Sequence, residues 1–365
     1  MPIGLRCLLG WLLVAPLAGG AEAPRVTLGL VAPPSEPDAK SLLRGVQLAV
    51  AEASERGQAP VGLEVRSEEG QWGTAGNDAV ILVSERHVDA ILSPSDGDTS
   101  HLILQVSGRT QVPVASVCSD SSVTAAGVIW AIRVVPRTDQ EVETLFDAAQ
   151  GRGRSPLHWW AVVPAGRPGR PVRRDLGKAA RLTSTHLDRV VDGGGPKTDV
   201  TPLVHTIVAA APDGVLLWLP PSTAGTMVAA LRGAGYGGIV AGPTPLDSPD
   251  FFAAAGAAAN GVLVTTFHVD AGSDARAEAF GRRFQERFSA KPDFSAAAAH
   301  DAAQVLIETL RRAGNGAGDR QFPLSHATEG VTGVLHFDSL GNRTDALQVL
   351  TCREGRFVSF SETKP

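Results

Sequence analysis

Two short runs of hydroxyl and carboxyl side chains are the residues of this chain best suited to hold a small ligand. Residues 93–100 read Ser-Pro-Ser-Asp-Gly-Asp-Thr-Ser, and residues 119–122 read Ser-Asp-Ser-Ser. Each run follows an apolar stretch typical of a buried strand and precedes a stretch with helical periodicity. In open parallel sheets ligands bind outside the carboxyl ends of the strands, where helix N-termini add free backbone N–H groups. The candidate ligand-binding residues in these loops are Asp96, Gly97, Asp98, Thr99, Ser119, Asp120 and Ser121.

The aspartates of these loops leave the polarity of the ligand open. If Asp96, Asp98 and Asp120 face the ligand, they repel a carboxylate and favour a cationic or hydroxyl-rich molecule, because a helix dipole offsets only about 0.3–1 kcal/mol per charge. If they instead cap the helices that follow, they face backbone N–H groups. In that case Arg167 and Arg170 can accept an anionic ligand. These two belong to an acid-free stretch, residues 151–174, whose arginines otherwise predict a solvated face.

The familiar motifs of enzymes are missing or lie in the wrong context. Residues 233–238 spell a dinucleotide-binding fingerprint, but they follow a predicted helix and precede a strand, the reverse of the required order. The sequence has no Gly-x-Ser-x-Gly elbow, Walker loop, Cys-x-x-Cys or His-Glu-x-x-His. The nine histidines do not form metal-ligand pairs. We therefore expect no catalysis, no cofactor and no metal.

Composition excludes further classes of protein. With 43% hydrophobic and 19% charged residues, the chain can bury a full core and is neither disordered nor fibrous. Its 365 residues predict two domains or one large one, at roughly 100–200 residues per domain. A net charge of −5 gives no global electrostatic reason to bind nucleic acid.

Residues 1–23 have the layout of a secretory signal peptide. Arg6 precedes the apolar run Leu8–Leu17, and small residues follow up to Ala23. The run is shorter than the roughly 20 residues of a membrane span, so we expect an exported, periplasmic protein without membrane insertion, cleaved after Ala21 or Ala23. Two cysteines remain, Cys118 and Cys352, and we expect buried thiols rather than a disulfide.

From residue 26 onward, apolar runs alternate with amphipathic stretches, which predicts βα units on parallel sheets. Two similar sets of strands follow each other. Long helical patterns at 275–288 and 295–313 have no partner strand of their own, and a closing hairpin is expected over 347–360. The predicted strands of the two sets are 26–32, 62–67, 88–93, 112–118 and 128–135, then 158–164, 187–192, 214–220, 238–243 and 261–269.

Four segments resemble a known family in order and spacing. They are 44–51 (RGVQLAVA), 133–140 (RVVPRTDQ), 300–302 (HDA, where the family has Tyr-Asp-Ala) and 330–342 (GVTGVLHFDSLGN). Over nearly the whole mature chain the sequence resembles the type I extracytoplasmic solute-binding proteins of ABC transporters, in the branched-chain amino-acid-binding branch.

The resemblance implies an α/β fold of two doubly wound, Rossmann-like lobes joined by three crossovers, with a ligand trapped between them by hinge closure. We expect crossovers near 135–137, 266–269 and 331–333. Lobe 1 would then hold residues 24–136 and 269–331, and lobe 2 residues 137–268 and 332–365.

The resemblance also places ligand residues in the second lobe, and there the chain departs from the family. The family's ammonium-binding carboxylate, which follows a Gly-Pro pair, aligns with Thr244, and its cleft tyrosines align near Gly169 and Pro220. An unpaired buried charge costs several kcal/mol, so we do not expect a standard branched-chain amino acid to bind. Trp72 and Trp218 are candidates for lining the pocket, with core packing as the alternative.

The leading hypothesis is a monomeric, non-enzymatic receptor that delivers a small polar solute to the membrane permease of an ABC transporter. The alternative is a ligand-sensing protein that regulates a partner receptor without transport.

Overall fold

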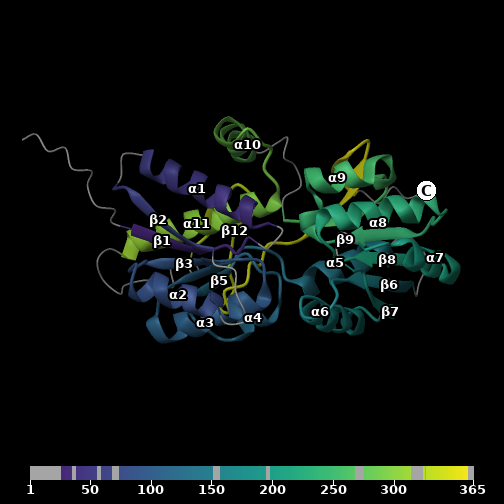
Figure 1. Ribbon diagram of the computed structural model, residues 1–365, viewed down its shortest axis with the longest axis horizontal. Helices are drawn as coiled ribbons and strands as arrows, with labels where there is room; N and C mark the ends of the chain where they lie inside the picture. The colour runs from purple at the N-terminus through teal and green to yellow at the C-terminus, as the bar shows by residue number, and fades with distance from the viewer. Residues whose placement is uncertain are drawn as a thin grey trace, which may run out of the picture.

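The computed structural model describes residues 26–360, apart from 35–37, 56–58, 68–73, 151–156, 195–197, 268–274, 314–323 and 325. Its helices and strands form two α/β lobes side by side (Figure 1). The predicted fold class is confirmed. The predicted signal peptide and Trp72 lie outside the described residues.

The first lobe is built on a parallel sheet with strand order β2-β1-β3-β4-β5. Leu28, Leu30 and Leu92 in its strands are completely buried, which explains the apolar runs that the sequence shows. The strands are β1 (Val26–Val31), β2 (Val61–Arg66), β3 (Ala90–Ser93), β4 (Val114–Ser116) and β5 (Ala131–Arg133). The helices that precede β5 are α1 (Ala39–Glu55), α2 (Thr74–Ser84), α3 (Gly97–Thr110) and α4 (Ser122–Ala125).

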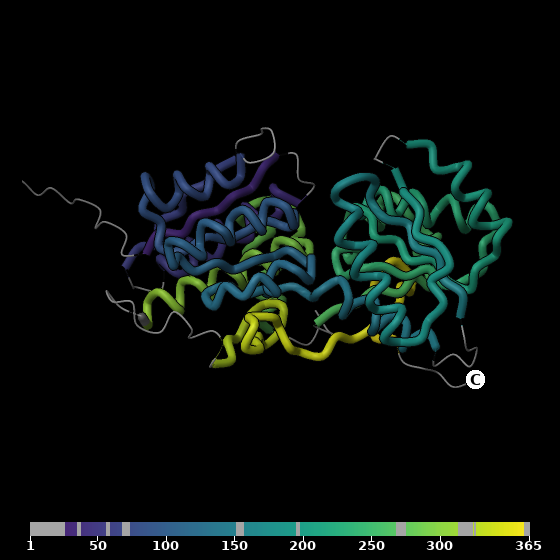
Figure 2. The backbone as a smooth tube through the Cα atoms, turned by 90° about the horizontal axis from the view of Figure 1, so that it is seen from below, coloured from purple at the N-terminus to yellow at the C-terminus, as the bar shows by residue number. Residues whose placement is uncertain are grey.

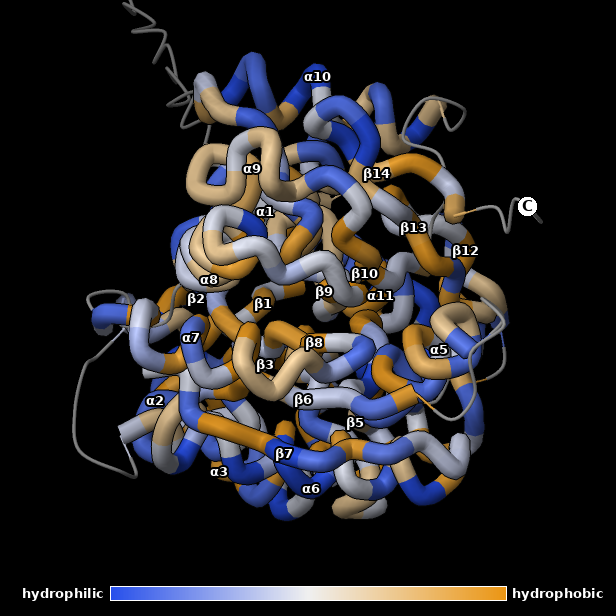
Figure 3. Tube along the Cα trace, turned by 90° about the vertical axis from the view of Figure 1, so that its right-hand side faces the viewer, coloured by the Kyte–Doolittle hydropathy of each residue, from blue (hydrophilic) through white to orange (hydrophobic). Residues whose placement is uncertain are grey.

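The second lobe has a seven-stranded sheet with order β14-β13-β10-β9-β8-β6-β7, antiparallel only where β13 and β14 join. Figure 3 shows hydrophobic residues on inner strands such as β8 and hydrophilic residues on α6 outside. The strands are β6 (His158–Val163), β7 (His186–Asp192), β8 (Gly214–Leu217), β9 (Ile239–Gly242), β10 (Leu263–Thr266), β13 (Gln348–Arg353) and β14 (Arg356–Ser359). The helices are α5 (Thr138–Gln150), α6 (Gly169–Leu182), α7 (Thr201–Ala210), α8 (Pro221–Gly233), α9 (Pro249–Ala255) and the short η1 (Thr244–Leu246) and η2 (Gly256–Ala259).

The two late helices cover the first lobe. Alanines of α11 (Phe294–Ala313) share a buried cluster with α1 and β1, and α10 (Ala275–Phe288) packs Phe280 and Phe284 beside Leu48 of α1. Cys118 and Cys352 are buried free thiols in different lobes, as expected. Residues 233–238 lead from the end of α8 to the start of β9, so they are not a dinucleotide-binding motif, which would lead from a strand into a helix.

The third crossover needs a correction. The resemblance predicts a crossover at 331–333, with residues 332–365 in the second lobe. Instead, β11 (Thr328–Gly330) and β12 (Gly333–Leu335) form their own hairpin, and the chain then runs along β5, where Arg133 N donates to Gly341 O at 2.8 Å. It crosses only before Gln348, at the start of β13 (Figure 2). Gly341 makes this approach possible, since its φ is +79° and a Cβ would lie 2.1 Å from the carbonyl oxygen of Ala131.

The contact between α1 and α11 gives a prediction. A Cβ on Gly45 would lie 2.1 Å from the carbonyl oxygen of Ala296, whereas one on Gly281 of α10 would meet nothing within 4 Å. We expect Gly45→Ala to cost about 1–3 kcal/mol through overpacking. Gly281→Ala should stabilise the protein by about 0.4–1 kcal/mol. Urea unfolding of both variants checks this, and equal midpoints would contradict the close packing.

Candidate functional site

A cleft of about 740 Å³ lies between the two lobes. It is lined by the residues that directly follow β3, β4 and β5 on one side and β6, β8 and β9 on the other. The carboxyl ends of both sheets therefore face the same space, as expected for ligand sites of doubly wound folds. The lining residues nearest these strand ends are Ser95, Val117, Ser119, Val135, Pro136, Pro164, Trp218, Leu219, Pro220 and Pro243.

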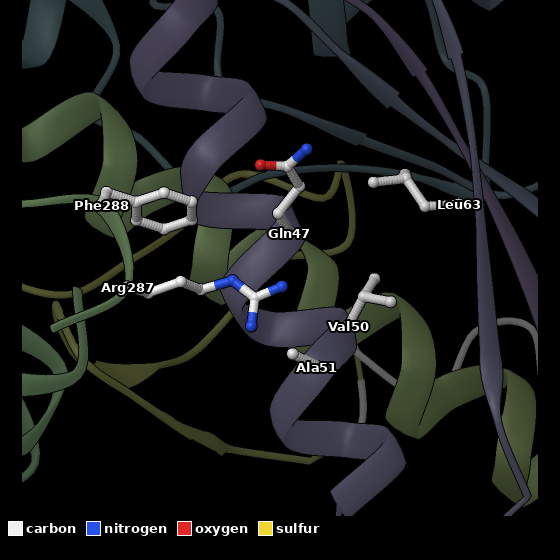
Figure 4. A pocket seen from close by; sticks show the side chains of 6 residues that line it. All are labelled: Gln47, Val50, Ala51, Leu63, Arg287 and Phe288. Carbon is white, nitrogen blue, oxygen red and sulfur yellow. The ribbon is translucent and has the colours of Figure 1, made fainter.

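A second hollow, of about 520 Å³, lies within the first lobe. Its lining residues come from α1, β2 and the end of α10, and Figure 4 shows Gln47, Val50 and Ala51 on α1 with Leu63 to one side. It has no lining residue from the second lobe, so the inter-lobe cleft is the better candidate.

The structure brings only some of the predicted ligand residues to this cleft. Ser119 and Pro220 line it, and Thr244 lies between two lining prolines, Pro243 and Pro245. Trp218 lines the cleft and also belongs to a buried core cluster, so both interpretations of it hold. The predicted residues that are not among the cleft's lining residues are Asp96, Gly97, Asp98, Thr99, Asp120, Ser121 and Arg167.

Asp96 acts as a helix cap. Its Oδ2 accepts a hydrogen bond from Thr99 N at 2.7 Å, at the start of α3. Asp120 also faces backbone, because its Oδ1 accepts from Ser122 N at 2.8 Å. The capping alternative describes the contact of Asp96, whereas the N-cap position of α4 is Ser121 and not Asp120.

Two of the loop aspartates also form ion pairs across the gap between the lobes. Arg174 Nη2 lies 2.6 Å from Asp120 Oδ1, and Arg167 Nη2 lies 2.6 Å from Asp98 Oδ2. Ser121 donates to Asp175 from both its N and its Oγ. Burial would raise the pKa of Asp120, but hydrogen bonds from Ser122 and Arg174 outweigh it and lower that pKa. Part of the arginine-rich stretch thus docks the second lobe on the acidic loops of the first.

Sequence reasoning missed the most unusual side chain of the cleft, Glu141 of α5. It is 1% exposed, and its Oε1 accepts three hydrogen bonds: from Thr244 N at 2.8 Å, Thr244 Oγ1 at 2.8 Å and Thr265 Oγ1 at 2.7 Å. Burial raises the pKa of Glu141 to about 7. The sequence contains a signal of this burial, because Glu141 lies one helical turn before Leu145, on the apolar face of α5.

Glu141 also removes an argument made from the sequence. The expectation that an amino acid would not bind rested on the absence of a carboxylate at Thr244. The structure holds the Glu141 carboxylate against the backbone N–H and the hydroxyl of Thr244. A carboxylate is thus present at this place, although it comes from another element.

The first-lobe wall of the cleft carries charges of both signs, which sequence reasoning also missed. Asp38 accepts a hydrogen bond from Ser95 Oγ at 2.9 Å, and Asp293 accepts one from Ser41 Oγ at 2.7 Å. The cations on this wall are Lys40, Arg44 and Lys291.

Comparison with known proteins agrees with this geometry. Residues 25–341 match the family model described as periplasmic binding protein. The chain belongs to the periplasmic binding protein family. A comparison with the curated proteins gave no match.

Solved structures of this family share the fold. The substrate-binding protein LivJ from Streptococcus pneumoniae, solved with isoleucine, is 16% identical, with a TM-score of 0.78 over 91% of this chain and 97% of that one. The leucine-binding protein LivK from Thermotoga maritima is 19% identical, with a TM-score of 0.77 over 92% and 98%. A solute-binding protein from R. palustris, solved with benzoate, is 17% identical, with a TM-score of 0.79 over 92% and 95%.

Two further observations concern the described residues alone. No helix among them is both long and apolar enough to cross a membrane. They also bring together no group of three His, Cys, Asp or Glu side chains that could hold a metal ion.

The different roles of Asp96 and Asp98 give a prediction. We expect Asp96→Ala to cost about 0.5–2 kcal/mol, because the first turn of α3 loses its cap. Asp98→Ala should cost less than about 1 kcal/mol, because Asp98 and Arg167 are both half exposed to solvent. Urea unfolding of the two variants decides this, and a larger loss for Asp98→Ala would show that the assignment is wrong.

Glu141 gives a prediction about stability and pH. Its pKa rises from 4.5 to about 7 on folding, so the unfolded chain releases this proton first as the pH rises. Protonated Glu141 therefore contributes about 3 kcal/mol to the free energy of unfolding below pH 4.5, relative to high pH. This contribution is lost as the pH rises from 4.5 to 7. We expect Glu141→Gln to become more stable relative to the parent protein across this window. A difference in unfolding free energy that stays constant with pH would contradict the raised pKa.

Proposed function

We propose that the protein is the substrate-binding component of an ABC transporter, which holds a small polar solute in the inter-lobe cleft and delivers it to a membrane permease. In this proposal it acts in the periplasm as a monomer without enzymatic activity, after removal of residues 1–23 or 1–21. The observation that carries the proposal is a single cleft lined by the strand ends of both lobes.

The size and the lining of the cleft support a small solute. A volume of about 740 Å³ lies within the range of roughly 300–1,000 Å³ typical of small-molecule sites. The relatives solved with isoleucine and with benzoate hold molecules of this class.

Helix N-termini at the cleft support a polar solute. The first turns of α1, α8, α9 and α11 all contribute lining residues. The first turns of α9 and α11 are capped by side chains, because Phe251 N donates to Ser248 Oγ and Ala296 N donates to Asp293 Oδ1. The N-terminus of α8 has no side-chain cap, so its free backbone N–H groups suit polar ligand atoms.

The test is native mass spectrometry of the protein purified from its own periplasm. We expect one small solute per chain, released on denaturation. Ser222→Trp fills the cleft from the first turn of α8 and should abolish the bound mass. Thr226→Trp, one turn further along the same exposed helix face, should retain it. A folded parent protein that carries no solute and closes on none would overturn the proposal.

A further inference from the structure

One oxygen of the Glu141 carboxylate is held by the protein, and the other is left for the cleft. All three hydrogen bonds to Glu141 arrive at Oε1, from Thr244 and Thr265. Among the described residues Oε2 has no hydrogen-bond partner, and Glu141 is one of the residues that line the cleft. The two threonines therefore fix the carboxyl group with its second oxygen available to a bound molecule.

The protein provides no counter-ion for this carboxylate within the described residues. Asp139, on the same helix, takes up the nearby cations, because it pairs with Arg137 at 2.9 Å and with Lys178 at 2.5 Å. Glu143 is partly exposed and lines no part of the cleft. The other charged side chains that line the cleft form no ion pair with Glu141. They are Asp38, Lys40, Arg44, Asp250, Lys291 and Asp293.

We propose that Glu141 Oε2 receives a cationic nitrogen of the solute, so that the cleft selects molecules with a protonated amine over neutral or purely anionic ones. This inference rests on the proposed function. Three donors on Oε1 favour the ionised carboxylate, while burial without a counter-ion opposes it. A cation from the solute removes that opposition when the cleft closes and water leaves.

The proposal fixes the sign of a pH effect. Only the ionised carboxylate pairs with a cation, so binding releases a proton below pH 7 and affinity rises with pH. With a pKa of about 7 in the unliganded protein, affinity at pH 6 should be about tenfold lower than at pH 8.

The experiment is a calorimetric titration with benzylamine, benzyl alcohol and benzoate, which share a ring and carry positive, zero and negative charge. We expect benzylamine to bind at least tenfold more tightly than the other two at pH 8, and to lose about tenfold in affinity at pH 6. Glu141→Gln should abolish both the preference and the pH dependence. Glu143→Gln removes a carboxylate from the same helix outside the cleft and should leave both unchanged.

Thr265→Val tests the positioning of the carboxyl group. It removes one of the three donors on Oε1 in a side chain of similar shape, so the pKa of Glu141 should rise. The midpoint of the pH profile for benzylamine should then move upward, which a merely structural role for Thr265 would not produce.

The failure of this inference is distinguishable from the failure of the proposed function. If benzoate or benzyl alcohol binds as well as benzylamine, or if benzylamine does not bind at about 10 mM, the inference is wrong. It is also wrong if the solute recovered by native mass spectrometry has no protonatable nitrogen, although that result supports solute binding. An unchanged affinity of Glu141→Gln for benzylamine overturns the inference even where benzylamine binds tightly.

Discussion

The structure depends on the way in which parallel sheets expose their carboxyl ends. In a parallel sheet that is covered by helices on both faces, the carboxyl ends of the strands and the N-termini of the following helices stay uncovered. Here two such sheets turn these ends toward each other, and residues after six of their strands line one cleft. The position of the cleft is therefore a consequence of the topology, and the side chains at the strand ends decide only what it holds.

Charge pairing between the lobes balances two of the carboxylates in the acidic loops. Asp98 and Asp120 obtain cations from Arg167 and Arg174, so their charges are balanced within the protein. The pair with Asp120 is the more protected, because that side chain is 9% exposed whereas Asp98 is 53% exposed. The half-exposed pair of Asp98 with Arg167 is therefore expected to contribute little to stability.

The sequence predicted the fold far better than the contacts of the site. Apolar runs marked the strands because both faces of a parallel sheet are buried, as Leu28 and Leu216 illustrate. Pairings across the gap, such as Arg174 with Asp120, depend on how two lobes dock, and no local pattern encodes that. The third crossover was misplaced for a similar reason, since the hydrogen bond from Arg133 to Gly341 joins residues more than 200 positions apart.

Glu141 shows why a functional group should be sought by its place in space as well as by alignment. Thr244 stands where the family has a carboxylate side chain. Its backbone N–H and its hydroxyl both donate to the carboxylate of Glu141, which belongs to α5. The same threonine that seemed to remove the charge instead positions it. The carboxylate beside Thr244 comes from α5, more than 100 positions earlier in the chain, and only the folded chain reveals that the two residues meet.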